Sequence, residues 1–521
     1  MLDFSQPYPS QRSPVCAGNV VATSQPLAAQ AGLQALRRGG NAVDAALATA
    51  IALTVVEPNN NGVGSDAFAI LWDGEQLHGL NASGRSPAGW TEGYFAGREQ
   101  MPTLGWDAVT VPGAVSAWVT LSERFGRLPF DDLFEDAVRY ARDGFQVGPI
   151  TARYWQGAAN TYADYAAFRE HFLPAPEPGA LFRRPDLADT LERIARTRGE
   201  AFYRGELADA MERAAIDGGG ALRRSDLEAH EPYWVQPTEQ RYKDISLHEI
   251  PPNGQGLAAQ IALAILAHLP DAPVGSEDAL HLEIEAMKIA VRAAADHFAD
   301  PEAMRLSPED LLAPGSIEAA AAGIGHRASP LPPTALPVGQ DTVYLTTADA
   351  SGMMVSFIQS NFMGFGSGVV IPGTGISMQN RGQGFVLDPA HPNAVGPRKR
   401  PFHTIIPGFV TEAGAPRMSF GVMGGHMQHQ GHVQMVRRIF DGRQNPQAAS
   451  DAPRWHVYPD FTVGLEPGVA PQIHAGLEAR GHRVRYDKRP WIFGGAQLIY
   501  RTPDGYVAGS DHRKEGCAVG F

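Results

Sequence analysis

The chain has 521 residues, of which 44% are hydrophobic and 19% charged, as in a globular protein with one large domain or two to three ordinary ones. Lys and Arg total 43 against 56 Asp and Glu, giving a formal net charge of −13 at pH 7. This acidic balance argues against a nucleic-acid partner or an anionic membrane surface, because both require a basic footprint.

The cysteine content and the first twenty residues further limit the class of protein that this chain can be. The only cysteines, Cys16 and Cys517, lie at opposite ends, which excludes a disulfide scaffold and argues against a cysteine-based zinc site. The first twenty residues contain no basic stretch followed by an apolar one, so no signal peptide is predicted. The most apolar stretch, residues 42–56, is too short to span a bilayer. We therefore expect a cytoplasmic protein with no membrane partner.

The chain opens with two predicted helices. Ser24 is a candidate cap for a first helix that begins near Pro26 and ends at Gly39 and Gly40. Residues 42–55 predict a second helix that is apolar nearly all round and therefore buried.

Strands and further helices follow. Residues 66–83 predict two strands around an Asp73–Gly74 turn, and residues 112–230 are mostly helical in pattern. Residues 244–266 are typical of a strand, a Pro/Gly turn and a long buried helix, and residues 277–299 predict another helix.

Residues 327–341 mark a change of character. Their prolines forbid regular helix and predict an extended, mobile segment. The chain is β-rich afterwards: residues 342–349 and 352–360 alternate around a turn, as in a hairpin. Further strands are predicted within residues 368–380, 404–412, 417–425 and 495–511. The fold class is therefore α/β with mainly antiparallel sheets.

Thr342 is the first residue of this β-rich part, directly after the proline-rich segment. A hydroxyl residue there could attack the preceding carbonyl, and hydrolysis of the resulting ester would make Thr342 a new N-terminus. Its freed amine, with a pKa of about 7.7–8.0, could then act as general base for its own hydroxyl. The local pattern alone favours an ordinary strand threonine, because Thr is common in strands.

A second candidate lies in residues 419–434, where a strand runs into Gly424 and Gly425 before a predicted helix. Paired glycines let backbone N–H groups converge as an oxyanion hole requires, and a tight strand-to-helix turn explains them equally well. His426, His429 and His432 suggest a metal by their spacing. No HExxH motif accompanies them, which favours a polar helix start.

Several blocks of the sequence resemble the γ-glutamyltranspeptidase (glutathione hydrolase) family of N-terminal nucleophile (Ntn) hydrolases, over nearly the full length. The blocks are "LRRGGNAVDAALA", "EPNNNGVGSDAF", "VPGAVSAW", "ARDGF", "PPNGQG", "DTVYLTTADASG", "NAVGPRKRPFHTIIP" and "VMGGHMQHQGHVQ". Together they are far more specific than any single motif. They overturn the ordinary interpretation of Thr342.

The resemblance implies a precursor that cuts itself between Asp341 and Thr342. The products would be a large chain of residues 1–341 and a small chain of residues 342–521, folded together as an αββα sandwich. Thr342 would be the nucleophile, Ser360 the hydroxyl that supports it, and Gly424 and Gly425 the oxyanion donors. No cofactor or metal is implied. The expected partners are a small-molecule amide and the two chains themselves, with a homodimer of that unit as an open alternative.

The resemblance breaks down at the substrate pocket. Typical members hold the glutamyl α-carboxylate with an Arg four residues before a Pro, whereas Arg85 stands two before Pro87. Gly384 occupies the position of the Asp that holds the α-amine, and Phe362 replaces an Asn beside the nucleophile. Arg85, Arg381, His403 and Thr404 are candidate replacement contacts for an acyl group that bears an acid, and each one alone is explained comparably well as a solvated loop residue.

Three functions remain open at this point. The resemblance implies an amide hydrolase or acyltransferase that acts through an acyl-enzyme on Thr342, with γ-glutamyl compounds such as glutathione as candidate substrates. The altered pocket suggests an amidohydrolase for a small carboxylate-bearing amide such as oxamate, or a cephalosporin-type acylase. An unprocessed binding protein is the alternative outside enzymes.

Overall fold

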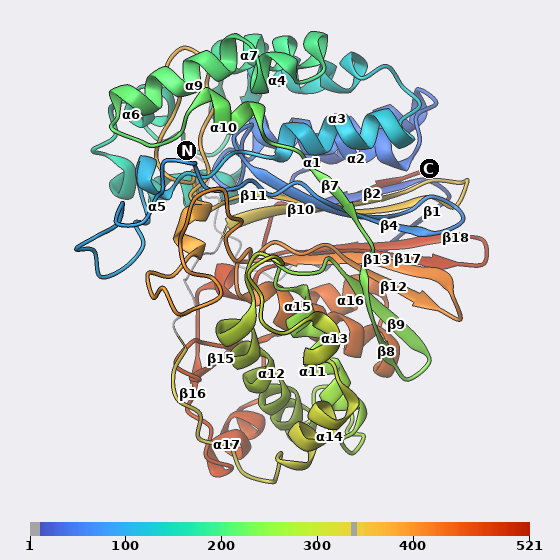
Figure 1. The fold of residues 1–521 in the computed structure, drawn as a ribbon. Helices are drawn as coiled ribbons and strands as arrows, with labels where there is room; N and C mark the ends of the chain where they lie inside the picture. The colour runs from blue at the N-terminus through green and yellow to red at the C-terminus, as the bar shows by residue number, and fades with distance from the viewer. Residues whose placement is uncertain (1–10, 335–340) are drawn as a thin grey trace.

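The computed structural model describes residues 11–334 and 341–521. In these residues two seven-stranded sheets lie face to face, and helices cover the outer side of each (Figure 1). The β10 sheet has the order β19 (Cys517–Gly520), β2 (Val20–Thr23), β10 (Asp341–Ala348), β11 (Met354–Phe362), β3 (Asp66–Trp72), β4 (Leu77–Asn81) and β7 (Tyr233–Val235). The β13 sheet has the order β1 (Val15–Ala17), β18 (Gly505–Ser510), β17 (Gly495–Thr502), β13 (Ala415–Met423), β12 (Gly408–Glu412), β9 (Ile245–Glu249) and β8 (Thr238–Tyr242).

Neighbouring strands pair antiparallel throughout both sheets, which confirms the predicted sheet type and gives an αββα sandwich. Apolar side chains from the two inner faces, among them Phe68, Tyr344, Ile358 and Ile499, form one buried cluster between the sheets. Sheet-on-sheet packing of this kind buries alternate residues of each strand.

The outer helices divide between the two faces of the sandwich (Figure 1). On the β10 side lie α1 (Pro26–Arg37), α2 (Ala42–Val56), α3 (Ala114–Phe125), α4 (Glu135–Asp143), α5 (Pro149–Tyr162), α6 (Ala166–Phe172), α7 (Pro185–Thr197), α8 (Glu200–Tyr203), α9 (Glu206–Asp217) and α10 (Arg224–Glu228). On the β13 side lie α11 (Gly256–Ala267), α12 (Glu277–His297), α13 (Pro308–Leu311), α14 (Pro314–Ala322), α15 (Met427–Val436), α16 (Pro446–Asp451) and α17 (Pro471–Ala479). None of these described helices is long and apolar enough to cross a membrane.

Shorter elements complete the described chain. β14 (Trp455–Val457), β15 (Val463–Leu465) and β16 (Val484–Tyr486) form a small separate sheet, and β5 (Phe145–Gln146) pairs with β6 (Leu181–Phe182). The short helical turns are η1 (Trp106–Ala108), η2 (Asp131–Phe134), η3 (Arg381–Gly384), η4 (Arg437–Asp441) and η5 (Pro490–Phe493).

The first two helices show how sequence and structure agree and differ. Every residue of α2 is buried, as its apolar pattern predicts, and a reciprocal capping box of Asn41 and Asp44 begins the helix. The prediction that Ser24 caps α1 is wrong. The Gln25 side chain accepts from the N–H groups of Leu27 and Ala28, while the Ser24 hydroxyl donates to Glu57.

The β-rich half follows most of its predicted strands. The β10–β11 hairpin and the β17–β18 pair form as expected. The strand predicted within residues 368–380 is wrong, since the segment has only two isolated bridges, between Val370 and Ser377 and between Met378 and Gly64. Gly373 and Gly375, with φ of +69° and +71°, turn the chain there instead.

The described part of the proline-rich segment packs against the helices of the β13 side. Glu285 of α12 accepts from the Ser329 N–H at 2.9 Å, and Lys288 donates to the Ser329 carbonyl at 2.6 Å. The Thr334 N–H donates to the Pro459 carbonyl at 2.8 Å. The rest of that prediction, from residue 335 to 340, lies outside the described residues.

Candidate active site

Thr342 lies in β10 where the pairing with β11 is irregular. Asp341 pairs with Phe362 and Val343 with Gln359, so the register shifts by one residue at Thr342. Such bulges re-aim a side chain and occur next to active sites. The Thr342 side chain is 1% exposed, its hydroxyl donates to Oγ of Ser360 at 3.1 Å, and it accepts from Nε2 of Gln428 at 3.4 Å. The predicted nucleophile is therefore held from two sides.

Ser360 is held in turn by Phe362, the last residue of β11. Its Oγ accepts from the Phe362 N–H at 2.8 Å, and Phe362 has a φ of +79°, which is uncommon for a bulky residue. The structure thus brings Ser360 to the place where a supporting hydroxyl is predicted.

The predicted oxyanion turn joins β13 to α15. Gly424 has a φ of +119°, and a Cβ there would lie 3.0 Å from Cα of Gly494. The Gly425 carbonyl accepts from Nε2 of Gln255 at 2.8 Å. Gln428, three residues after Gly425, reaches the Thr342 hydroxyl. The turn is therefore rigid and adjacent to the nucleophile.

Two of the three histidines after this turn, His429 and His432, contact buried polar side chains. Nδ1 of His429 lies 2.9 Å from Oε1 of Gln255, and Nδ1 of His432 lies 2.6 Å from Oε1 of Glu249. Burial, with the neighbouring histidines, holds the pKa of His429 well below its usual value. α15 is buried all round, and the described residues contain no group of three side chains that could hold a metal.

Arg381 and Thr404 are both buried and contact each other. Nη1 of Arg381 donates to Oγ1 of Thr404 at 2.7 Å, and the guanidinium lies 5.0 Å from the centre of the Phe362 ring. Arg381 is 2% exposed, and its Nε and Nη2 have no partner among the described residues. Burial lowers the pKa of Arg381 to about 9, while the carboxylate of Asp66 opposes the shift. Such a cation requires an anionic partner.

Asp66 and His403 complete this cluster. Asp66 pairs with Ser360 in the β3–β11 register, so Thr342, Ser360 and Asp66 stand on three adjacent strands. Nε2 of His403 lies 3.1 Å from Oδ2 of Asp66. Burial and the Arg381 charge hold the pKa of His403 well below its usual value, so the ring is neutral and donates from Nε2.

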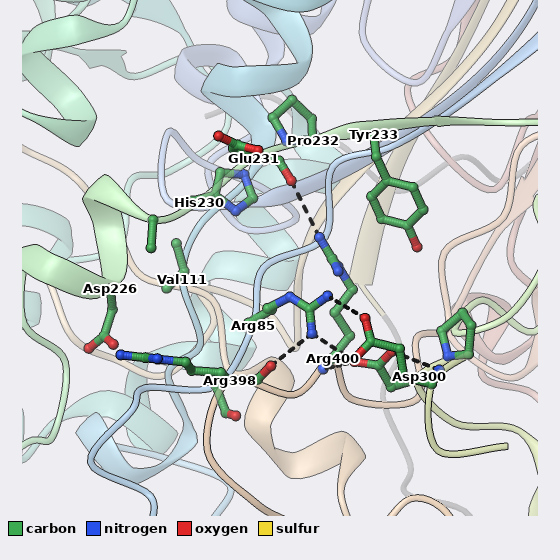
Figure 2. A pocket seen from close by; sticks show the side chains of 14 residues that line it. Arg85, Val111, Asp226, His230, Glu231, Pro232, Tyr233, Asp300, Arg398 and Arg400 are labelled. Carbon is green, nitrogen blue, oxygen red and sulfur yellow. Dashed lines mark hydrogen bonds and ion pairs between the residues drawn. The ribbon is translucent and has the colours of Figure 1, made fainter.

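Arg85 lies in a pocket of about 800 Å³, shown in Figure 2. Its Nη1 lies 3.3 Å from Asp300 and donates to the Arg398 carbonyl at 2.8 Å, and its Nη2 lies 3.3 Å from Glu302. Thr342 and Arg381 are not among the described residues that line this pocket. The structure therefore brings Arg381, His403 and Thr404 together around Asp66, whereas the Arg85 side chain contacts Asp300, Glu302 and Arg398.

Three residues that organise the site were not predicted from the sequence: Asp66, Gln255 and Gln428. Nε2 of Gln255 donates to the carbonyls of Thr404 and Gly425, and thereby links Thr404 to the oxyanion turn. Gln255 lies within "PPNGQG" and Gln428 within "VMGGHMQHQGHVQ". Both blocks carry the family resemblance, but the sequence does not indicate which of their residues lie near Thr342.

Comparison with known proteins agrees with this geometry. The family model described as γ-glutamyltranspeptidase matches residues 28–521. The chain is 34% identical over 511 residues to a glutathione hydrolase-like YwrD proenzyme of Bacillus subtilis, covering 95% of this chain and 97% of the relative. It is also 34% identical over 516 residues to an oxamate amidohydrolase proenzyme of Klebsiella pneumoniae, with the same two coverages.

The similarity extends to a solved structure. A cephalosporin acylase from Bacillus halodurans superimposes with a TM-score of 0.96 at 47% identity, covering 100% of this chain and 99% of that one. These relatives are named as hydrolases, amidohydrolases and acylases, and two of them as proenzymes. The chain belongs to the γ-glutamyltranspeptidase family of Ntn hydrolases and is an enzyme of the amide-hydrolase and acylase class.

Proposed function

We propose that the chain is cut between Asp341 and Thr342, and that the mature enzyme hydrolyses amides whose short acyl group ends in a carboxylate. In processing, the Thr342 hydroxyl attacks the Asp341 carbonyl carbon and the peptide nitrogen leaves as an amine. Water then hydrolyses the ester and frees the Thr342 hydroxyl. The products are chains of residues 1–341 and 342–521.

In turnover the Thr342 amine accepts the proton of its own hydroxyl as the oxygen attacks the substrate amide. The amide C–N bond breaks, the leaving amine takes the proton, and an acyl ester forms on Thr342. Water hydrolyses this ester and releases the free acid. Ser360 and Gln428 orient the hydroxyl, and the N–H groups of Gly424 and Gly425 stabilise the oxyanion.

Arg381 carries the substrate assignment. Its guanidinium packs on the Phe362 ring, and the Phe362 N–H is bonded to Ser360, which in turn accepts from Thr342. Phe362 and Ser360 therefore connect Arg381 to the reacting hydroxyl of Thr342. Nε and Nη2 of Arg381 have no hydrogen-bond partner within the described residues. A carboxylate on the acyl group would accept from both nitrogens and compensate the buried charge.

The same cluster favours a glutaryl-like group over a γ-glutamyl group, which also carries an α-ammonium. Asp66 is the carboxylate whose charge acts on Arg381. It accepts from the N–H groups of Gly84 and Gly113 and contacts His403. It has little capacity left for a substrate ammonium. One relative is named an oxamate amidohydrolase and another a cephalosporin acylase. These names support the proposal that the acyl group is not γ-glutamyl.

A substrate panel tests this assignment. We expect the mature enzyme to hydrolyse glutaryl-p-nitroanilide with a higher kcat/KM than either γ-glutamyl-p-nitroanilide or the uncharged pentanoyl-p-nitroanilide. The Arg381→Gln variant should lose about 10- to 100-fold in kcat/KM for the glutaryl substrate, the value of hydrogen bonds to a charged group. Its rate on the pentanoyl substrate should stay the same. Equal losses on both substrates would contradict the assignment.

The Arg85→Gln variant decides between the two arginines predicted as substrate contacts. If the acyl carboxylate binds at Arg381, the preference for glutaryl over pentanoyl survives in Arg85→Gln and disappears in Arg381→Gln. The reverse outcome would place the carboxylate in the pocket of Figure 2. Circular dichroism and processing into two chains check that each variant folds.

A further inference from the structure

A cavity of about 490 Å³ opens beside the residues that follow β11. Its walls include Tyr154 and Tyr162 of α5, Met363, and Trp491 of η5. The Tyr154 and Trp491 rings meet edge to face, with centroids 6.2 Å apart and planes at 88°. The cavity therefore offers three aromatic side chains beside Arg153 and small residues of α5.

This cavity adjoins both parts of the catalytic machinery. Met363 directly follows Phe362, whose N–H fixes Ser360. At Trp491, which also lines the cavity, the carbonyl accepts from the Gly494 N–H at 3.2 Å. The Gly494 backbone lies against Gly424. The cavity is thus connected through Met363 to the segment that holds Ser360, and through Trp491 to the oxyanion turn at Gly424.

Asn59 adds an unsatisfied polar group to this wall. Its side chain is 2% exposed, and neither Nδ2 nor Oδ1 has a hydrogen-bond partner among the described residues. Its backbone is held, because its carbonyl accepts from the Phe365 N–H at 3.1 Å. Buried amides are almost always paired, so an orphaned carboxamide that lines a cavity points to a polar ligand group.

We propose that this cavity is the subsite for the leaving amine, and that it takes a flat aromatic amine with a polar substituent. The inference rests on the proposed hydrolysis at Thr342. The aromatic ring would pack against Tyr154 and Trp491, and the substituent would donate to and accept from Asn59. When the acyl ester forms on Thr342, the amide C–N bond breaks, the amide nitrogen takes the proton, and the neutral amine departs through this cavity.

Hydrolysis of two glutaryl amides tests the subsite. The wild-type enzyme should show a higher kcat/KM for glutaryl-p-nitroanilide than for the primary amide of glutarate. The Trp491→Leu variant should lose about 3- to 10-fold in kcat/KM on the anilide, the value of one aromatic contact, and nothing on the primary amide. The exposed Tyr486→Leu of β16 serves as the surface control and should change neither rate. Equal losses on both amides would show a merely structural role for Trp491 and overturn the proposal.

Binding without an acyl group separates this proposal from the proposed function. In calorimetry with the mature enzyme, 4-aminobenzamide should bind more tightly than aniline, and Asn59→Ala should remove that difference. Trp491→Leu should weaken both ligands. If neither amine binds, the subsite is wrong even though glutaryl amides are hydrolysed. If the amines bind as expected but no glutaryl amide is hydrolysed, the acyl assignment is wrong and the subsite stands.

Discussion

The hydroxyl of Thr342 donates a hydrogen bond to Oγ of Ser360, 3.1 Å away, across the β10–β11 pair. Both side chains are buried, and the Phe362 N–H holds the Ser360 oxygen from its other side. This contact fixes where the Thr342 hydroxyl points before any substrate arrives. Orientation of this kind lowers a barrier without new chemistry.

Removal of the Ser360 hydroxyl should therefore slow both processing and turnover. We expect Ser360→Ala to lower kcat about tenfold, the equivalent of one neutral hydrogen bond to a reacting group. The time course of chain cleavage on a denaturing gel and the kcat on glutaryl-p-nitroanilide measure the two effects. Ser360→Thr keeps the hydroxyl and should retain most of the rate. An Ser360→Ala variant that processes and turns over normally would contradict this role.

Gly424 should tolerate no side chain. Gly424→Ala places a Cβ 3.0 Å from the Gly494 backbone at a φ of +119°. We expect the free energy of unfolding to fall by about 1–3 kcal/mol and kcat to fall as the turn shifts. The matched control is Gly414→Ala, where φ is +79° but no atom lies within 4 Å of the new Cβ. Similar kcat values for the two variants would show that Gly424 does not shape the oxyanion turn.

Thr404 should affect substrate binding rather than the chemical step. Thr404→Val removes the hydroxyl that accepts from Nη1 of Arg381 and keeps the shape of the side chain. The guanidinium then loses its orientation, so KM for glutaryl-p-nitroanilide should rise about threefold to tenfold at unchanged kcat, the value of one hydrogen bond. Steady-state kinetics on the glutaryl and pentanoyl substrates measures this. A fall in kcat at constant KM would place Thr404 in the chemical step instead.

Acid pH should strengthen the binding of a dicarboxylate product. Burial raises the pKa of Asp66 to about 7, while the Arg381 charge opposes the shift. As the pH falls through 7, Asp66 takes up a proton, loses its negative charge and leaves the Arg381 cation uncompensated. Glutarate should then bind more tightly at pH 6 than at pH 8, by about tenfold for an interaction of ~1.4 kcal/mol.

The Thr342 amine gains a proton over a similar pH range, so wild-type binding alone does not isolate Asp66. The Asp66→Asn variant removes the carboxylate at every pH. Calorimetry should show that this variant binds glutarate more tightly than the wild type at pH 8, with a smaller difference between pH 6 and pH 8. An unchanged pH dependence would show that Asp66 does not control the Arg381 charge.

Elements with local causes could be predicted from the sequence. α2 follows from an unbroken apolar run, and the β10–β11 hairpin from alternation on both sides of a turn. The strand predicted within residues 368–380 failed because its apolar residues are buried in core clusters that include helix residues, such as Leu187 of α7, rather than by a strand ladder. The cap of α1 was misplaced by one residue, since Ser24 hydrogen-bonds a glutamate that lies 33 positions away.

The family resemblance, and not the local pattern, makes Thr342, Gly424 and Gly425 candidate site residues. Asp66 contacts His403, which lies 337 positions further along the chain, so the sequence gives no local sign of its role. Arg85 and Arg381 were equal candidates by sequence. Their surroundings separate them, because Arg85 is bound by two carboxylates and two nitrogens of Arg381 have no hydrogen-bond partner in the described part of the chain.

The central claim is that Thr342 becomes an N-terminal nucleophile by self-cleavage. Intact mass measurement of the purified wild type and of Thr342→Ala tests this most directly. We predict that the wild type resolves into two chains, the smaller beginning at Thr342, and that Thr342→Ala remains a single inactive species of 55.9 kDa. A wild type that is active as one uncut 55.9 kDa chain, or a Thr342→Ala chain that still splits, would contradict the account.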